Sequence, residues 1–177
     1  LDPTHSELNF KIKHLMISTV TGNFKQFNLE VETNDDFKSA KKIDFTADIN
    51  SINTNNEQRD AHLKSADFFN AEKHSQIVFS GTNYEANGDE GKLHGNLTIA
   101  GISKPITLNV EFGGIAVDPY GQTKAGFTVT GKLSRKEFGI TYGAVTETGG
   151  VLLADEIKIN AEIQLVKQAE KAGELAA

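Results

Sequence analysis

Five histidines are the first candidates for chemistry in this chain of 177 residues, but their spacing does not suit a metal ion. No His-x-His and no His-x3-His is present, the spacings that bring two ligands onto one face of a strand or helix. The chain has no cysteine, which excludes thiolate catalysis and zinc–thiolate sites. It also lacks the Gly-x-Ser-x-Gly turn of serine hydrolases and the Gly-x4-Gly-Lys-Ser/Thr phosphate loop. We therefore expect no catalytic residues, no metal and no catalytic cofactor.

Three side chains remain candidates for binding a polar group. His14 shares a strand face with Phe10 and Ile12, so it is either a buried imidazole with one hydrogen-bond partner or a polar anchor inside a cavity. Arg59 either ties a helix to the body of the protein or binds the polar head of a ligand through paired hydrogen bonds. The same two interpretations hold for Arg135, which either fixes the loop that follows it or meets a ligand head.

The elements that position these side chains are predicted to be β-strands. Hydrophobic residues recur at every second position, which is typical of strands with one apolar face. The phase of this alternation slips at Lys25-Gln26, which predicts a β-bulge or a sharp bend within the second strand. Turn residues such as Asn87-Gly88 and Asp118-Pro119 separate the segments. The eight predicted strands are centred on residues 8–14, 20–31, 43–49, 77–79, 93–99, 106–112, 127–133 and 157–165.

Short hairpin connections predict an antiparallel sheet. Eight such strands can close into a barrel, which removes the sheet edges, or split into a two-sheet sandwich with the same periodicity. Strands of about 8–14 residues, against a usual 5–6, favour the barrel. One segment lacks the alternation, and there Thr54 followed by Glu57 predicts a capping box and a helix over residues 55–70. The predicted fold class is all-β, an extended eight-stranded antiparallel lipocalin-like β-barrel with a short capping helix.

The inner face of this barrel is almost wholly apolar and mixes large with small side chains, which leaves gaps. A tall, narrow, apolar interior suits a long unbranched lipid better than a compact polar metabolite. Filled packing between Phe45, Phe79 and Phe127 would instead indicate a dry barrel with a structural role or a protein partner. The residues expected to line the interior are Phe10, Ile12, Phe27, Leu29, Phe45, Ala47, Ile49, Phe79, Leu97, Leu108, Val110, Phe127, Val129, Phe138 and Ile159.

Composition narrows the partners and the domain organisation. The formal net charge of −6 disfavours a nucleic-acid binder, because phosphate contacts need a basic face. No apolar run approaches the roughly 18 residues of a membrane span, so we expect no integral membrane segment. The length predicts one domain over residues 1–166, followed by a flexible alanine-rich tail over residues 167–177.

Several ordered motifs resemble those of the YceI-like family of bacterial lipocalin-like proteins, and the resemblance covers about residues 1–166. The segment of the predicted helix carries the most specific of them. One departure is Gln76, where the family often has proline. The matching stretches are Asp2-Pro3-Thr4-His5-Ser6, Gly22-Asn23-Phe24, Arg59-Asp60-Ala61-His62-Leu63, Asp67-Phe68-Phe69-Asn70, Ile77-Val78-Phe79-Ser80, Leu97-Thr98-Ile99-Ala100-Gly101 and Arg135-Lys136-Glu137-Phe138-Gly139-Ile140.

The resemblance implies a barrel that binds a long isoprenoid chain, with a quinone or phosphate-type head near one end. It implies a carrier or sequestering protein, with an isoprenoid lipid, a quinone or another long-chain amphiphile as its ligand. The head group would then lie near His14, Arg59 or Arg135. Most relatives are periplasmic and some are cytoplasmic. The resemblance therefore implies a periplasmic location, with the cytoplasm as the alternative. Because the chain begins at Leu1 and not at Met, we also expect a missing upstream segment, either a signal peptide or a short tag.

Two further expectations concern partners and catalysis. A homodimer is one expectation. A hydrolase or isomerase acting on a lipid head is an alternative to a binding protein, and it would need a histidine and a carboxylate within hydrogen-bond reach in one cleft. His62 and Asp60 are the nearest such pair in the sequence, but residues two apart on a helix do not face each other.

Overall fold

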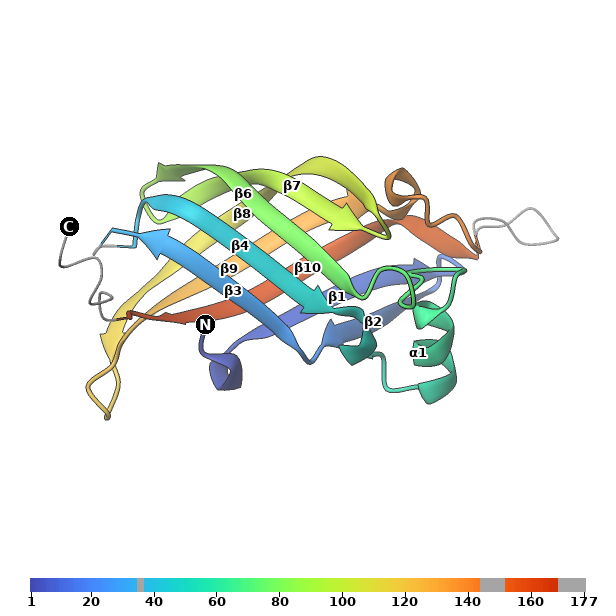
Figure 1. Ribbon diagram of the computed structural model, residues 1–177, viewed down its shortest axis with the longest axis horizontal. Helices are drawn as coiled ribbons and strands as arrows, with labels where there is room; N and C mark the ends of the chain where they lie inside the picture. Colours follow the sequence, from blue (N-terminus) through green and yellow to red (C-terminus); the bar gives the residue numbers. More distant parts are fainter. Residues whose placement is uncertain (35–36, 144–151, 169–177) are drawn as a thin grey trace.

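Ten antiparallel strands form one strongly curled sheet, which makes up the body of the protein (Figure 1). The computed structural model describes residues 1–34, 37–143 and 152–168. The strands follow the order β3-β4-β6-β7-β8-β9-β10-β1-β2-β5 across the sheet. They are β1 (Glu7–His14), β2 (Ser18–Phe24), β3 (Phe27–Thr33), β4 (Ala40–Asp48), β5 (Ile52–Asn53), β6 (Gln76–Asn87), β7 (Glu90–Ile99), β8 (Ile102–Val117), β9 (Thr123–Ser134) and β10 (Leu153–Val166). The helices are α1 (Glu57–Lys64) and the 3₁₀ turns η1 (Pro3–His5), η2 (Ile49–Ser51) and η3 (Arg135–Phe138).

The two-residue period explains the strands, because burial alternates along them as the sequence does. In β7 every second residue is buried, from Gly91 to Ile99. The link from β7 to β8 is a two-residue turn at Ala100 and Gly101, both of which have positive φ, as the twist of a tight hairpin requires. The all-β antiparallel fold class predicted from the sequence is confirmed.

The strand count differs from the prediction because the chain breaks at Lys25-Gln26. The predicted second strand is two strands, β2 pairing with β1 and β3 pairing with β4. At the break, the Lys25 N–H donates to the Ser51 carbonyl at 3.1 Å, and the Gln26 carbonyl accepts from the Asp48 N–H at 2.9 Å. These bonds turn the chain out of one ladder and into the next. Together with the two-residue strand β5, this break makes ten strands where eight were expected.

The curled sheet keeps one seam without a hydrogen-bonded ladder. β3 is an outer strand of the sheet order, and among the described residues no ladder joins it to β1 or β10. Side chains fill the seam instead, since Leu29 and Val31 of β3 pack with the cluster that contains Ile163 and Leu165 of β10. The sheet is therefore a half-barrel that side-chain packing completes.

Helix α1 covers one end of the barrel, and it is shorter than the predicted 55–70 (Figure 1). The predicted capping box is wrong, because Asn56 is the N-cap and its side chain accepts from the Arg59 N–H. Thr54 is buried, and its hydroxyl donates to Asp60 at 2.6 Å. The segment that follows the helix is held by Phe68 and other partly buried hydrophobic residues that pack on the core.

The C-terminal part of the chain leaves the sheet after β10. The Lys167 N–H still bonds to the Thr123 carbonyl at 2.9 Å. The remainder of the predicted flexible tail, residues 169–177, lies outside the described residues. No helix in the described part of the chain is long and apolar enough to cross a membrane.

Candidate functional site

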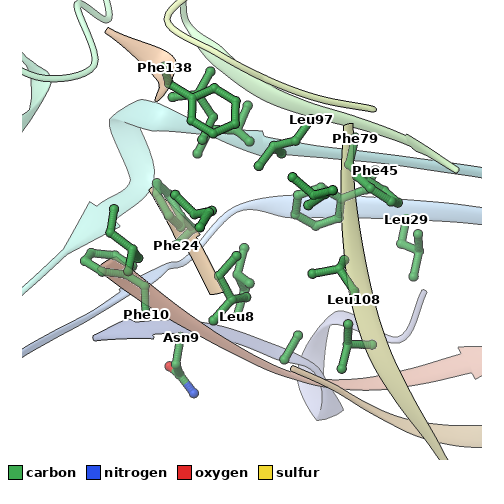
Figure 2. Close-up of a pocket in the computed structure, with 18 of the residues that line it drawn as sticks. Leu8, Asn9, Phe10, Phe24, Leu29, Phe45, Phe79, Leu97, Leu108 and Phe138 are labelled. Atoms are coloured by element: carbon green, nitrogen blue, oxygen red, sulfur yellow. The ribbon is translucent and has the colours of Figure 1, made fainter. Parts of the chain in front are cut away.

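A cavity of about 460 Å³ occupies the interior of the barrel (Figure 2). Its walls are apolar side chains from every strand except the short β5. Figure 2 shows Phe10 and Phe24 toward one side of this space and Phe45 and Phe79 toward the other. The volume lies within the range of small-molecule sites, about 300–1,000 Å³.

The structure places most of the residues predicted to line the interior around this cavity. Ala47 and Ile49 are instead wholly buried within the wall, at the end of β4 where η2 begins, and Phe27 packs against Phe45 without reaching the cavity. These three do not line the cavity, because burial on the inner face is not the same as exposure to an internal space, and their contact with a ligand stays a prediction. The predicted residues that do line the cavity are Phe10, Ile12, Leu29, Phe45, Phe79, Leu97, Leu108, Val110, Phe127, Val129, Phe138 and Ile159, and their contact with a ligand stays a prediction.

Aromatic rings of the cavity wall, among them those of Phe10 and Phe79, lie over glycines and so leave the cavity wide. A side chain at Gly22 would overlap the ring of Phe10, and one at Gly95 would overlap the ring of Phe79 and lie 2.5 Å from the Ser80 carbonyl oxygen. Neither glycine lines the cavity. Each instead provides a recess in the sheet that accepts a ring and keeps it against the wall.

The cavity has an electrical polarity along its length. The lining residues His14, Arg59, His62, Arg135 and Tyr142 gather where α1 covers the barrel, and we call them the α1 end. No Asp, Glu or Lys lines the cavity among the described residues. Arg59 is exposed, and Tyr142 is 44% exposed, so the cavity reaches the surface here. The formal charge along the cavity is therefore positive at the α1 end and absent elsewhere.

The opposite end is closed by an apolar side chain and edged by neutral polar groups. Phe37, in the connection from β3 to β4, is buried and packs with Leu165 and Ala125. Thr33 and Ser39 are the polar lining residues beside it. We call Thr33, the last residue of β3, together with Phe37 and Ser39 of the connection, the far end of the cavity.

Arg135 is fixed by backbone carbonyls at the α1 end. It is 2% exposed, and its Nε donates to Ala154 O at 2.9 Å while its Nη2 donates to Leu153 O at 3.1 Å. Its Nη1 donates to Ile140 O at 3.1 Å and to Tyr142 O at 2.6 Å. Burial lowers the pKa of the guanidinium, and the charge of Asp155 opposes that effect. The structure thus supports the interpretation that Arg135 holds the loop after it, while its charge also faces the cavity.

Asp155 balances this charge without touching the guanidinium. Burial raises the pKa of Asp155, but hydrogen bonds and neighbouring positive charges together lower it by more. The hydrogen bonds come from Ser134 Oγ at 2.6 Å and from the Lys136 N–H at 3.0 Å. The charges of Lys136 and Arg135 act in the same direction. Asp155 is therefore ionised and lies outside the cavity lining, which keeps the cavity itself free of negative charge.

Arg59 is held on one side and available on the other. Its Nε donates to Thr54 Oγ1 at 2.7 Å and its Nη2 to Thr54 O at 2.6 Å. Asp60 accepts from the hydroxyl and the N–H of the same threonine, so the two residues tie α1 to the barrel as one interpretation predicted. The Nη1 of Arg59 has no hydrogen-bond partner within the described residues. The other interpretation, a contact with a ligand head, stays a prediction for this free nitrogen.

Two imidazoles complete the α1 end. The ring of His14 lines the cavity and has no hydrogen-bond partner among the residues the structure describes. The ring of His62 packs against Phe68 and Tyr142, with centroids 5.0 and 4.8 Å away, and its Nε2 lies 2.8 Å from Asp67 Oδ2. His62 and Tyr142 are lining residues that the sequence did not reveal as such.

The His62–Asp67 contact is the pair that a hydrolase would need. No serine, threonine or other hydroxyl in the described residues bonds to the imidazole of His62, and two aromatic rings enclose that imidazole. Within the same part of the chain, no group of three or more His, Asp or Glu residues is placed to hold a metal ion.

Comparison with known proteins places the chain in a family. The family model of the YceI-like domain matches residues 1–165. A UPF0312 protein of Staphylococcus aureus (strain USA300) is 42% identical over 164 residues, 92% of this chain and 94% of that protein. The crystal structure of the Campylobacter jejuni YCEI protein is similar, with a TM-score of 0.78 at 40% identity over 96% of this chain and 97% of that one. A polyisoprenoid binding domain from Saccharophagus degradans shares the fold, with a TM-score of 0.69 at 16% identity over 95% of this chain and 97% of that one. The chain therefore belongs to the YceI-like family.

Proposed function

We propose that this protein binds one long-chain isoprenoid lipid in its barrel, with the head group at the α1 end, and carries or sequesters it. The observation that carries the proposal is the polarity of the cavity, which is apolar along its walls and positively charged at one end. A structural relative whose name describes a polyisoprenoid binding domain supports the same class of ligand.

The length of the cavity suits a chain rather than a compact molecule. Lining residues of β10 extend from Leu153 to Leu165, which is roughly 40 Å along the strand at about 3.3 Å per residue. With a strand tilt of about 40°, this corresponds to roughly 30 Å along the barrel axis. Phe45, Phe79 and Phe127 all line the open space, which argues against a dry, filled barrel.

The driving force comes from the walls and the selectivity from the α1 end. Each CH₂ group that leaves water contributes about 0.8 kcal/mol, and ordering the chain offsets part of that gain. A head group with acceptor oxygens, such as a quinone or a phosphate, can accept from the free Nη1 of Arg59. The absence of carboxylates from the described lining means that such a head meets no repulsion there.

Mass spectrometry of an organic-solvent extract of the purified protein tests this function. We expect a stoichiometric isoprenoid from the wild type and its loss from Phe45→Trp/Phe127→Trp, which fills the cavity. Asn28→Trp/Asn160→Trp is the matched control, because both asparagines are exposed on the outer face of the barrel. A folded wild type that yields no lipid from cells that make isoprenoids, or equal lipid in both double variants, would overturn the proposal.

A further inference from the structure

Three consecutive apolar residues project into solvent at the turn between β1 and β2. Leu15, Met16 and Ile17 are 42%, 59% and 83% exposed. We call these three residues the apolar tip. Single exposed hydrophobic residues are ordinary, but contiguous apolar patches on a protein surface commonly mark an interaction site.

The backbone of the turn gives no reason for these residue types. The Ile17 N–H closes the turn on the His14 carbonyl at 3.2 Å, and both central residues have positive φ, 51° at Leu15 and 60° at Met16. Asn-Gly is the favoured pair for such a turn, because large side chains are strained in this region. Leucine and methionine therefore weaken the turn, and their apolar character needs another explanation.

The tip continues the wall of the cavity at its α1 end. The Leu15 N–H donates to Leu152 O at 2.8 Å, and His14 lies opposite Leu153 in the ladder of β1 and β10. His14, Leu152 and Leu153 all line the cavity. A surface that holds the tip would therefore face the α1 end of the cavity as well.

The charge near the tip is positive although the chain as a whole is negative. Between Glu7 and Glu30 the sequence has no acidic residue, and Lys11 and Lys13 are exposed on the strand that leads into the tip. Of the described acidic residues close to this end of β10, Asp155 is balanced by the charges of Lys136 and Arg135, and Glu156 lies 4.0 Å from Lys132. Helix α1 carries two acidic residues and two basic ones, counting Arg59 and Lys64, so it adds no net charge.

The size of the tip excludes a stable protein interface. Even an aromatic side chain buries only about 150–250 Å². Three smaller side chains therefore fall far short of the roughly 800 Å² that each partner buries in a standard interface. A small apolar projection beside lysines instead suits shallow insertion between the headgroups of an anionic bilayer.

We propose that the apolar tip docks the protein on the surface of an anionic lipid bilayer and holds the α1 end of the cavity against it. The use of this docking for loading and unloading a lipid rests on the proposed function, whereas the docking itself is independent of it. The partner is the bilayer surface, not a second copy of this chain.

Vesicle flotation measures the docking directly. Wild-type protein should bind vesicles of phosphatidylcholine and phosphatidylglycerol, and should bind phosphatidylcholine vesicles more weakly. Met16→Ser/Ile17→Ser should bind the anionic vesicles at least about tenfold more weakly, because two apolar side chains no longer leave water. The matched control is Val117→Ser/Tyr120→Ser in the turn between β8 and β9, where the side chains are 68% and 90% exposed at the opposite end of the barrel (Figure 1).

A tryptophan reporter gives a second measurement. The chain has no tryptophan, so Ile17→Trp introduces the sole indole, and its emission should shift to shorter wavelength when anionic vesicles are added. Val117→Trp, at the other end, should show no shift. A wild type that binds neither vesicle, a serine variant that binds as the wild type does, or equal shifts at both ends would overturn the docking.

Two controls separate this inference from its alternatives. If Met16→Ser/Ile17→Ser changes the mass of the protein in solution from dimer to monomer, the tip is an interface between copies and the proposal is wrong. Lipid in the solvent extract is scored independently of flotation. An empty extract with intact vesicle binding contradicts the proposed function alone, and a loaded extract without vesicle binding contradicts the docking alone.

Discussion

The two ends of the barrel are formed by the same strands, but different interactions complete them, and only the far end is closed. At the α1 end, guanidinium groups bond to backbone oxygens and threonine, and the cavity reaches the surface. At the far end, a buried phenylalanine closes the cavity, and ion pairs of Lys124 with Asp2 and Asp118 join the N-terminal segment to the β8–β9 hairpin. The difference shows that the strands set the length and width of the barrel, whereas the connections decide what each end admits.

The turns at the two ends also differ in how their backbone conformation is stabilised. The turn between β8 and β9 has Gly121 at a φ of 79°, and the Asp118 carboxylate accepts from the N–H groups of Tyr120 and Gln122. The turn between β1 and β2 holds Leu15 and Met16 in the same region of φ without such a cap. The far-end turn therefore combines a glycine at positive φ with stabilising hydrogen bonds, whereas the α1-end turn holds two large apolar residues in a strained backbone conformation.

Arg135→Met should have the largest effect, because it leaves four backbone carbonyls without their donor. We expect the free energy of unfolding to fall by about 3–5 kcal/mol, measured by urea denaturation. Arg59→Met is the matched control, and since that side chain is exposed its loss should stay below about 1 kcal/mol. Equal losses for the two variants would contradict the view that the buried Arg135 contributes more to stability than the exposed Arg59.

Phe37→Ala should open the far end. We expect a loss of about 2–4 kcal/mol in the free energy of unfolding, because a buried ring is removed from a packed cluster. The variant should also retain longer chains in the mass-spectrometric extract than the wild type does. Phe37→Leu keeps an apolar plug and should change both measurements less. A variant that loses stability but selects the same chain lengths would mean that Phe37 does not limit the cavity.

Substitutions that exchange the residue types of the two turns should change the free energy of unfolding in opposite directions. Leu15→Asn/Met16→Gly should raise the free energy of unfolding by about 1–2 kcal/mol, because it relieves positive φ at two residues. Gly121→Ala in the other turn should lower it by about 1 kcal/mol for the converse reason. Thermal unfolding of both variants measures this. A destabilised Asn-Gly variant would show that Leu15 and Met16 are packed rather than exposed.

Removing the ion pair between Asp2 and Lys124 at the far end should have the smallest effect on stability. The size of this effect should depend on pH. Lys124 Nζ lies 2.6 Å from Asp2, and this hydrogen bond, with a second from His5, holds the pKa of Asp2 well below its usual range. A carboxyl whose pKa is lower in the folded state stabilises the protein above its unfolded pKa of about 3.9, and that stability is lost as the pH falls further. The Tm difference between wild type and Asp2→Asn should therefore be largest near neutral pH and shrink below about pH 4. A difference that is constant with pH would contradict this.

The two-residue hydrophobic period was enough to predict most of the strands and many of the residues in the cavity wall. The alternation along each strand was enough to predict that Phe10, Ile12 and Phe79 face the cavity, because a strand places alternate residues on one face whatever its neighbours are. Leu93 and Ile157 share the same parity and also line the cavity, so the sequence contained that signal as well. Ala47 shows the limit of parity, since it faces inward but is covered by its neighbours.

Contacts between distant segments could not be predicted in this way. His62 and Tyr142 meet because α1 and the loop after η3 cover the same end of the barrel. Tyr142 follows a segment without alternation, so no local pattern marks it. The break at Lys25-Gln26 was visible as a change of phase, but whether it was a bulge or the end of a strand depended on Ser51 and Asp48, whose backbone groups lie elsewhere in the sequence.

The two recesses at Gly22 and Gly95 have a consequence for how ligand preference can change in this protein. One added methyl group at either position would displace a phenyl ring from the sheet toward the middle of the barrel. Under the proposed function, the width of the chain that fits the barrel is thus governed by two glycines that do not line the cavity. Selectivity for branched against slender chains can therefore be retuned by single substitutions on the sheet, while every side chain that faces the ligand stays the same.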